Sequence, residues 1–246
     1  MLTMSYDPTK TGYVHSTYSG GMVDGPGIRY VVFFAGCTLR CKYCHNPDTW
    51  AASRGTRMSV EEVLAEIVKY KSYYARSGGG VTISGGEPME QPGFLAELLK
   101  ACRENGINTA LDTAGNVAAS TLERIFPLTD LLMLDIKSCN PATYLDLTGK
   151  RIDPTLEALE IARNLNVRTW IRFVLVPGLT DDPKELAEMA EFLRQYKNIE
   201  KIEVLPFHKE GEYKWDSLVI PYALKDTPPP SQEQIQEAQR ILTLGR

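Results

Sequence analysis

Hydrophobic positions along the chain follow two alternating patterns. Short continuous apolar runs, which are typical of strands buried in a parallel sheet, are separated by longer segments that carry helix start and stop signals. The apolar runs predict six strands, at residues 30–35, 81–84, 108–113, 131–137, 168–176 and 201–207. Strands separated in this way by helices predict an α/β fold built from parallel β–α units.

Capping residues and prolines delimit the expected helices. A serine followed three residues later by Glu or Gln forms a capping box, and proline is favoured in the first helical turn. These signals predict helices that begin at Ser59, Pro92, Ser120, Asp153, Asp182 and Ser231, the first reaching about Tyr74 and the second ending before Gly106. A complete barrel of such units has about eight strands, so six strands predict a partial (β/α)6 TIM-like barrel. An open doubly wound sheet is the alternative.

The composition fits one cytoplasmic domain. The chain has 246 residues, of which 43% are hydrophobic and 24% charged, enough for one large core. We expect a single domain over residues 1–246, with an N-terminal extension over about 1–11 and a last helix at about 231–244. The net charge of −4 argues against nucleic-acid binding, and no apolar run approaches the ~20 residues that span a membrane. The five cysteines are an odd number and the N-terminus has no secretory features, so we expect reduced thiols and a cytoplasmic location.

Three cysteines lie in one short loop after the first predicted strand. Cys37, Cys41 and Cys44 form a C-x3-C-x2-C arrangement within residues 36–46. Three thiolates can hold one cubane iron–sulfur cluster, but they leave its fourth iron without a protein ligand. An iron of this kind can bind a small molecule, so the loop is interpreted as a reaction centre.

Two other metal chemistries use similar residues. Cys37, Cys41, Cys44 and His45 supply the donors of a structural Cys3His zinc site, which would make the chain a zinc-stabilised binding module. Adjacent Cys44 and His45 are awkward for closing one tetrahedron, however. The run from Cys41 to His45 also matches the attachment pattern of c-type haem, but haem gives no role to Cys37. The spacing therefore favours an iron–sulfur cluster.

Polar side chains also follow the other predicted strands. Glu87 comes after the second strand, Asp112 ends the third, Asp135 and Lys137 end the fourth, and His208 follows the sixth. In parallel β/α folds, ligand sites collect at the carboxyl ends of the strands. These residues and the cysteine loop are therefore expected on one rim. Two glycines before Glu87 allow the backbone to approach a ligand closely.

Several motifs resemble those of known enzymes. The cysteine loop resembles the signature of radical S-adenosylmethionine (SAM) enzymes, and Ser84–Pro88 resembles their GGE motif, which holds the methionyl amino group of SAM. The run 24–29, DGPGIR, resembles a motif of the activases of glycyl-radical enzymes. Residues 44–50, 170–178 and 205–208 resemble one subgroup, the pyruvate formate-lyase activating enzymes. The resemblance runs from about Gly12 to the terminal helix, and the absence of an inserted cysteine-rich module favours this branch.

The resemblance implies a fold, a reaction and its cofactors. The fold is the partial barrel of the radical SAM type, and Cys37, Cys41 and Cys44 hold one 4Fe–4S cluster. An electron from the cluster cleaves SAM, and the resulting deoxyadenosyl radical takes a hydrogen atom from a backbone glycine of pyruvate formate-lyase. The residues that match SAM contacts in the family are Tyr43, Cys44, His45, Gly86, Glu87, Asp135, Ile136, Lys137 and His208.

The resemblance also implies further partners. Four residues match a monovalent-cation site for Na⁺ or K⁺, namely Asp112, Thr113, Met133 and Asp135. Asp24, Gly25 and Arg29 match positions that bind the incoming glycine loop. Reduced flavodoxin or a similar low-potential protein is the expected electron donor, and a monomer is expected. Activation of another glycyl-radical enzyme, or a different radical SAM reaction such as deazaguanine synthesis, is the alternative function.

Overall fold

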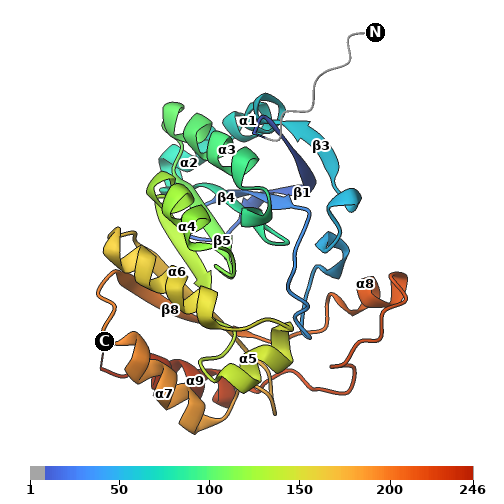
Figure 1. The fold of residues 1–246 in the computed structure, drawn as a ribbon, viewed down its shortest axis with the longest axis vertical. Helices are drawn as coiled ribbons and strands as arrows, with labels where there is room; N and C mark the ends of the chain where they lie inside the picture. Colours follow the sequence, from blue (N-terminus) through green and yellow to red (C-terminus); the bar gives the residue numbers. More distant parts are fainter. Residues whose placement is uncertain (1–8, 246) are drawn as a thin grey trace. The chain divides into compact units, whose positions relative to one another are not determined.

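The computed structural model describes residues 9–245 (Figure 1). Within them the chain forms eight strands that alternate with helices. The chain divides into two compact units that interleave along the sequence. Unit 1 comprises the chain up to Cys37, Thr49–Thr113 and Ser120–Leu132, and unit 2 comprises Thr38–Asp48, Ala114–Ala119 and the chain from Met133 onward. Each unit is described by itself.

Unit 1 is built on a mixed sheet. Its strands are β1 (Thr11–Gly21), β2 (Arg29–Phe34), β3 (Thr56–Ser59), β4 (Gly80–Gly85) and β5 (Thr109–Thr113), in the order β3-β1-β2-β4-β5. The central strands β2, β4 and β5 are parallel and mostly buried, as their continuous apolar sequences predict. Strands β1 and β3 are antiparallel additions at the edge. They were not predicted, because neither contains a continuous apolar run.

The helices of unit 1 confirm some of the capping signals. They are α1 (Val60–Val68), α2 (Lys71–Ser77), α3 (Pro92–Glu104) and α4 (Ala119–Ile125, entered from unit 2), with short 3-10 turns at Pro47–Thr49, Ala52–Arg54, Pro88–Glu90 and Phe126–Leu128. Ser59 and Glu62 form the predicted capping box. The single helix predicted to Tyr74 is instead two helices, and the Tyr74 hydroxyl donates to the carbonyl of Ile67 (2.9 Å) at the end of α1. The cap predicted at Ser120 is wrong, because α4 already begins at Ala119.

Unit 2 contains the remaining elements. Strand β6 (Leu131–Asp135) leads into it from unit 1, and β7 (Thr169–Leu175) pairs in parallel with β8 (Ile199–Pro206). Its helices are α5 (Pro141–Thr148), α6 (Asp153–Asn164), α7 (Pro183–Leu193), α8 (Glu212–Ser217) and α9 (Gln232–Thr243). Asp182 caps α7 and Ser231 caps α9, as predicted. Asp153 begins α6 but forms no side-chain cap, and α5 and α8 were not predicted.

The six predicted strands correspond to β2, β4, β5, β6, β7 and β8, with ends that agree within about two residues. The α/β class and the parallel pairing within each unit are thus confirmed. The single-domain extent over residues 1–246 remains a prediction, and most of the expected N-terminal extension lies outside the described residues. No helix in the described part of the chain is both long and apolar enough to cross a membrane.

Candidate active site

In unit 1, three strand ends bring predicted site residues together. After β2 the backbone turns at Gly36 (φ +106°), whose N–H donates to the carbonyl of Thr49 (2.7 Å). The N–H of Cys37 donates to the carbonyl of Trp50 (3.1 Å), and the carbonyl of Gly36 accepts the N–H of Glu87 (2.8 Å). The first cysteine of the loop and the Gly-Gly-Glu segment are therefore hydrogen-bonded neighbours.

Gly86 makes this close approach possible. A Cβ atom on residue 86 would lie 2.3 Å from the carbonyl oxygen of Gly36 and 3.2 Å from the Cβ of Cys37. The first distance is far below van der Waals contact, so any larger residue would displace the backbone that carries Cys37.

Glu87 is held rigidly at the end of β4. Its side chain is only 1% exposed. One carboxylate oxygen, Oε1, accepts the hydroxyl of Thr113 (2.6 Å) and the N–H of Met89 (3.1 Å). On β5, the carboxylate of Asp112 accepts the hydroxyl of Ser84 (2.7 Å). A carboxylate can accept several hydrogen bonds, and an ammonium group is one of the donors that suit it.

Arg29 of the DGPGIR segment is an interior residue of unit 1. Arg29 is the first residue of β2, so it lies at the opposite end of that strand from Cys37, and it is fully buried. Its guanidinium donates to Thr82 Oγ1 (3.0 Å), Asn108 Oδ1 (2.8 Å) and the carbonyl of Val81. Burial lowers its pKa to about 10. These bonds make Arg29 an anchor of the unit 1 interior. A role for Arg29 in binding a partner stays a prediction.

Asp24 and Gly25 lie in the same segment. The carbonyl of Asp24 accepts the Thr82 hydroxyl (2.6 Å), which links the segment to the Arg29 network. Gly25 is buried and has φ +119°, a conformation that favours glycine. The Asp24 side chain is only half-buried. A role for these two residues in binding a partner stays a prediction.

In unit 2, the rest of the cysteine loop rests on the end of α5. The N–H groups of Arg40 and Lys42 donate to the carbonyls of Thr148 (2.8 Å) and Leu147 (2.9 Å). These carbonyls are among the last of the helix, which have no partner within it. A turn bond from Cys44 N–H to the carbonyl of Cys41 (3.0 Å) closes the C-x2-C segment.

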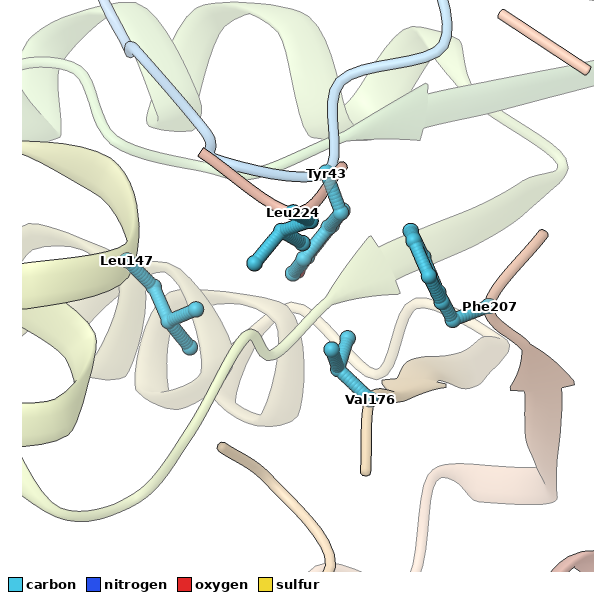
Figure 2. Packing of buried hydrophobic residues seen from close by; sticks show 5 residues of the cluster. All are labelled: Tyr43, Leu147, Val176, Phe207 and Leu224. Carbon is cyan, nitrogen blue, oxygen red and sulfur yellow. The ribbon is translucent and has the colours of Figure 1, made fainter. Parts of the chain in front are cut away.

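Tyr43 anchors the loop between its last two cysteines. Its ring packs with Leu147, Val176, Phe207 and Leu224, and Figure 2 shows these side chains converging on one another. The Tyr43 hydroxyl is buried and has no hydrogen-bond partner among the described residues. Burial raises the pKa of Tyr43 well above its ordinary value. A buried phenol of this kind suits a site that a polar ligand completes.

Lys137 and Asp135 form a buried pair after β6. The Lys137 ammonium lies 2.5 Å from Asp135 Oδ2 and 5.7 Å from the centre of the Tyr43 ring. Burial acts to lower the pKa of Lys137, but Asp135, Tyr43 and Cys41 together outweigh it and hold the pKa well above its ordinary value. Burial also raises the pKa of the Cys41 thiol to about 12, with the Lys137 charge opposing it.

His45 and His208 are in direct contact. Their rings meet edge to face with centroids 3.9 Å apart, and His45 Nε2 bonds the carbonyl of His208 at 3.1 Å. Burial and the neighbouring His208 lower the pKa of His45. Of the remaining predicted residues, Ile136 is buried and donates its N–H to the carbonyl of Arg172 (3.1 Å), and Met133 is fully buried.

The structure thus gathers predicted residues in two groups, one within each unit. No three His, Cys, Asp or Glu side chains of residues 9–245 meet as a metal-binding group, so the ligand role of the cysteines rests on their order in the chain. The three thiols are half-buried and form no disulfide, and this all-thiolate donor set fits an iron–sulfur cluster. Lys214 and Trp215, which also contact the loop, were missed because their polar segment carries no motif.

Comparisons with known proteins define the class. Residues 31–193 match the family model of the radical SAM superfamily, which is most of the chain. A radical SAM methyltransferase from Sphaerobacter thermophilus has a TM-score of 0.64 at 16% identity, covering 94% of this chain and 74% of that one. The chain therefore belongs to the radical SAM superfamily, and its fold is the open partial barrel predicted for that class.

Curated relatives define the branch. The pyruvate formate-lyase-activating enzyme of Clostridium pasteurianum is 45% identical over 231 residues, covering 94% of this chain and 97% of the relative. That of Listeria monocytogenes is 43% identical over 237 residues, covering 94% and 96%. Within the superfamily, the chain belongs to the pyruvate formate-lyase-activating enzymes. Membership in the radical SAM superfamily implies a 4Fe–4S cluster and SAM.

Proposed function

We propose that this chain activates pyruvate formate-lyase. The reaction is the reductive cleavage of SAM at a 4Fe–4S cluster and the abstraction of a hydrogen atom from a backbone glycine of the partner, which leaves a glycyl radical. Glycine suits this step because no side chain blocks its Cα. The observation that carries the proposal is the C-x3-C-x2-C loop at the end of β2, in a chain that matches activating enzymes over 94% of its length.

The thiols of Cys37, Cys41 and Cys44 are the proposed cluster ligands. When bound, the cluster supplies the electron that cleaves SAM. The chain contributes a loop whose backbone is fixed before it binds anything: Cys37 by the carbonyl of Trp50, and the C-x2-C segment by Tyr43 and the end of α5. A fixed loop favours cluster binding because little conformational entropy remains to be lost.

The proposed SAM site begins with the Gly-Gly-Glu segment. Glu87 accepts a hydrogen bond from the ammonium group of SAM, and its bonds to Thr113 and Met89 orient the carboxylate for this role. Gly86 leaves the room that a Cβ would fill. The remaining residues proposed to contact SAM are Tyr43, Cys44, His45, Asp135, Ile136, Lys137 and His208.

Four further parts of the proposal concern partners. A monovalent cation, Na⁺ or K⁺, is bound by Asp112, Thr113, Met133 and Asp135, because carboxylates beside the carboxylate of SAM need a cation between them. The segment that contains Asp24, Gly25 and Arg29 contacts the glycine loop of the partner. The electron donor is reduced flavodoxin or a similar low-potential protein. The enzyme works as a monomer in the cytoplasm.

The test is an anaerobic activation assay. The full chain is reconstituted with iron and sulfide, then incubated with SAM, dithionite and purified pyruvate formate-lyase. We expect cleavage of SAM and a glycyl-radical signal in electron paramagnetic resonance. Cys41→Ala should abolish cluster assembly, SAM cleavage and the signal together, whereas Cys102→Ala, a buried cysteine outside the loop, should retain all three.

Each failure has a separate meaning. Cleavage of SAM without a glycyl signal would reject the activase function and leave another radical SAM reaction. A colourless protein that binds zinc and cleaves no SAM would reject any radical SAM activity. Full activity in Cys41→Ala would contradict the ligand assignment.

A further inference from the structure

A segment late in the sequence lies against the second half of the cysteine loop within unit 2. Residues 209–226, here called the strap, contain α8 and follow β8. The strap begins its contact at Gly211, where a Cβ would lie 2.7 Å from the carbonyl oxygen of His45. Only glycine allows the two backbones to approach this closely. The strap is therefore seated directly on the residue that follows Cys44.

Trp215 bonds the backbone of Cys44 itself. Its indole Nε1–H donates to the carbonyl of Cys44 at 2.9 Å, and the side chain is only 5% exposed. The ring of Tyr222, also in the strap, packs against the indole with centroids 5.1 Å apart. An indole has one donor, so this bond and this packing fix both the position of the ring and the peptide plane after Cys44.

Lys214 holds the next residues of the loop. Its ammonium donates to Asn46 Oδ1 (2.8 Å) and pairs with Asp48, 3.1 Å from Oδ2 and 3.2 Å from Oδ1. The Lys214 and Asp48 side chains are only 18% and 21% exposed, so water and salt screen this pair less than a surface pair. One ammonium thus joins two positions of the loop to the strap.

The strap also supports the residue that precedes Cys44. Leu224, near its end, is part of the cluster around Tyr43 (Figure 2). Both neighbours of Cys44 are therefore fixed by one segment: Tyr43 through Leu224, and His45 through Gly211. The carbonyl of Cys44 is fixed between them by Trp215.

We propose that the strap is the positioning element of Cys44, and that Trp215 and Lys214 are positioning residues for this ligand. The inference rests on the proposed function, because it concerns a cysteine that binds the cluster. Neither side chain touches the thiol. They act through the Cys44 carbonyl and through Asn46 and Asp48, which determine where the sulfur is presented.

The test compares three strap variants with two matched controls. Trp215→Phe removes the donor and keeps an aromatic ring, Lys214→Met removes the charge and keeps the stem, and Lys214→Arg keeps charge and donors. The controls are Trp170→Phe and Lys201→Met. The Lys201 ammonium lies 4.4 Å from the centre of the Trp170 ring, and both residues are near the amino ends of β7 and β8.

Two measurements are made on the full chain. Hydrogen–deuterium exchange of residues 44–50 in the cluster-free protein reports the order of the loop. Iron release to a ferrous chelator from the anaerobic, reconstituted protein reports how firmly the cluster is held. We expect Trp215→Phe and Lys214→Met each to speed both processes about five-fold. This factor of about five corresponds to the net free energy that one hydrogen bond contributes. Lys214→Arg and both controls should stay within about two-fold of the parent.

Three results would overturn the proposal. The first is exchange and iron release that match the parent in both strap variants. The second is exchange that rises equally throughout unit 2, since the strap would then stabilise the fold in general. The third is faster exchange with unchanged iron release, because the order of the loop would not then affect the ligand. A parent chain that binds no iron would overturn the proposed function instead, and exchange alone would then decide whether the strap orders the loop.

Discussion

Arg29→Met tests whether the arginine of the DGPGIR segment is an interior anchor or a partner-binding residue. Methionine keeps the length and the apolar stem of the side chain but donates no hydrogen bond. The substitution removes the donor from two buried acceptors, Thr82 Oγ1 and the carbonyl of Val81, and from the partly buried Asn108 Oδ1. The arginine is fully buried, so water does not replace the guanidinium without rearrangement.

The magnitude follows from these bonds. Each buried polar group left unpaired costs about 1–3 kcal/mol. Removing a buried charge returns part of this, because burial of the guanidinium is itself unfavourable, as its lowered pKa indicates. We expect a net loss of about 3 kcal/mol in the free energy of unfolding. A domain has only about 5–15 kcal/mol in total, so this loss is large.

Urea denaturation of the parent and the variant measures the loss. The matched control is Arg168→Met. Arg168 makes a two-bond pair with Glu200, but the two side chains are 57% and 40% exposed. Exposed pairs contribute about 0–1 kcal/mol, so this variant should unfold close to the parent. If Arg29→Met kept the stability of the parent and lost only glycyl-radical formation, the anchor interpretation would be refuted and the sequence-based role restored.

Two further predictions follow. Gly86→Ala places a Cβ against the carbonyl of Gly36. We therefore expect a loss of about 1–3 kcal/mol in the free energy of unfolding and a reconstituted protein that binds little iron. Full iron content would contradict the close approach. Burial raises the pKa of Cys102 from 9.0 to about 12, so above pH 9 the unfolded chain releases a proton that the fold retains. Cys102 alone should therefore lower the free energy of unfolding by about 1.4 kcal/mol per pH unit between pH 9 and 12, and urea midpoints at pH 8 and 10 should show a shallower decline in Cys102→Ala than in the parent.

The strands that were predicted correctly are those whose burial is visible in their own residues. A strand buried on both faces, such as β2 or β4, must be apolar at consecutive positions, and its sequence shows this directly. Strand β1 pairs with two neighbours, but the side chains of its second half are mostly exposed. The sequence of β1 therefore shows no clear repeating pattern of apolar and polar residues. Pairing through backbone hydrogen bonds does not depend on side-chain type, so the sequence does not reveal it.

The same reasoning applies to the predicted site residues, whose roles stay predictions. The cysteine loop and Glu87 were identified because their chemistry requires particular residue types at short spacing. The environment of Arg29 depends on Thr82 and Asn108, which are 53 and 79 residues away along the chain. A charged residue at the start of a strand is normally solvated, and nothing near Arg29 in the sequence indicates that its partners surround it. The motif therefore points to the segment, but it does not show where the Arg29 side chain lies.

Sequence motifs do not identify the residues that hold the candidate site in place. The carbonyls of Leu147 and Thr148 hold the cysteine loop as backbone atoms, so any residue that continues α5 supplies them equally well. Trp215 acts on a carbonyl too, and its bond to Cys44 spans 171 positions. A loop with three correctly spaced cysteines, moved to another scaffold, would lack these acceptors and donors. Only the bound cluster would then order its thiols, at a cost in conformational entropy. In this fold α5, Tyr43 and the strap already order the loop before the cluster binds.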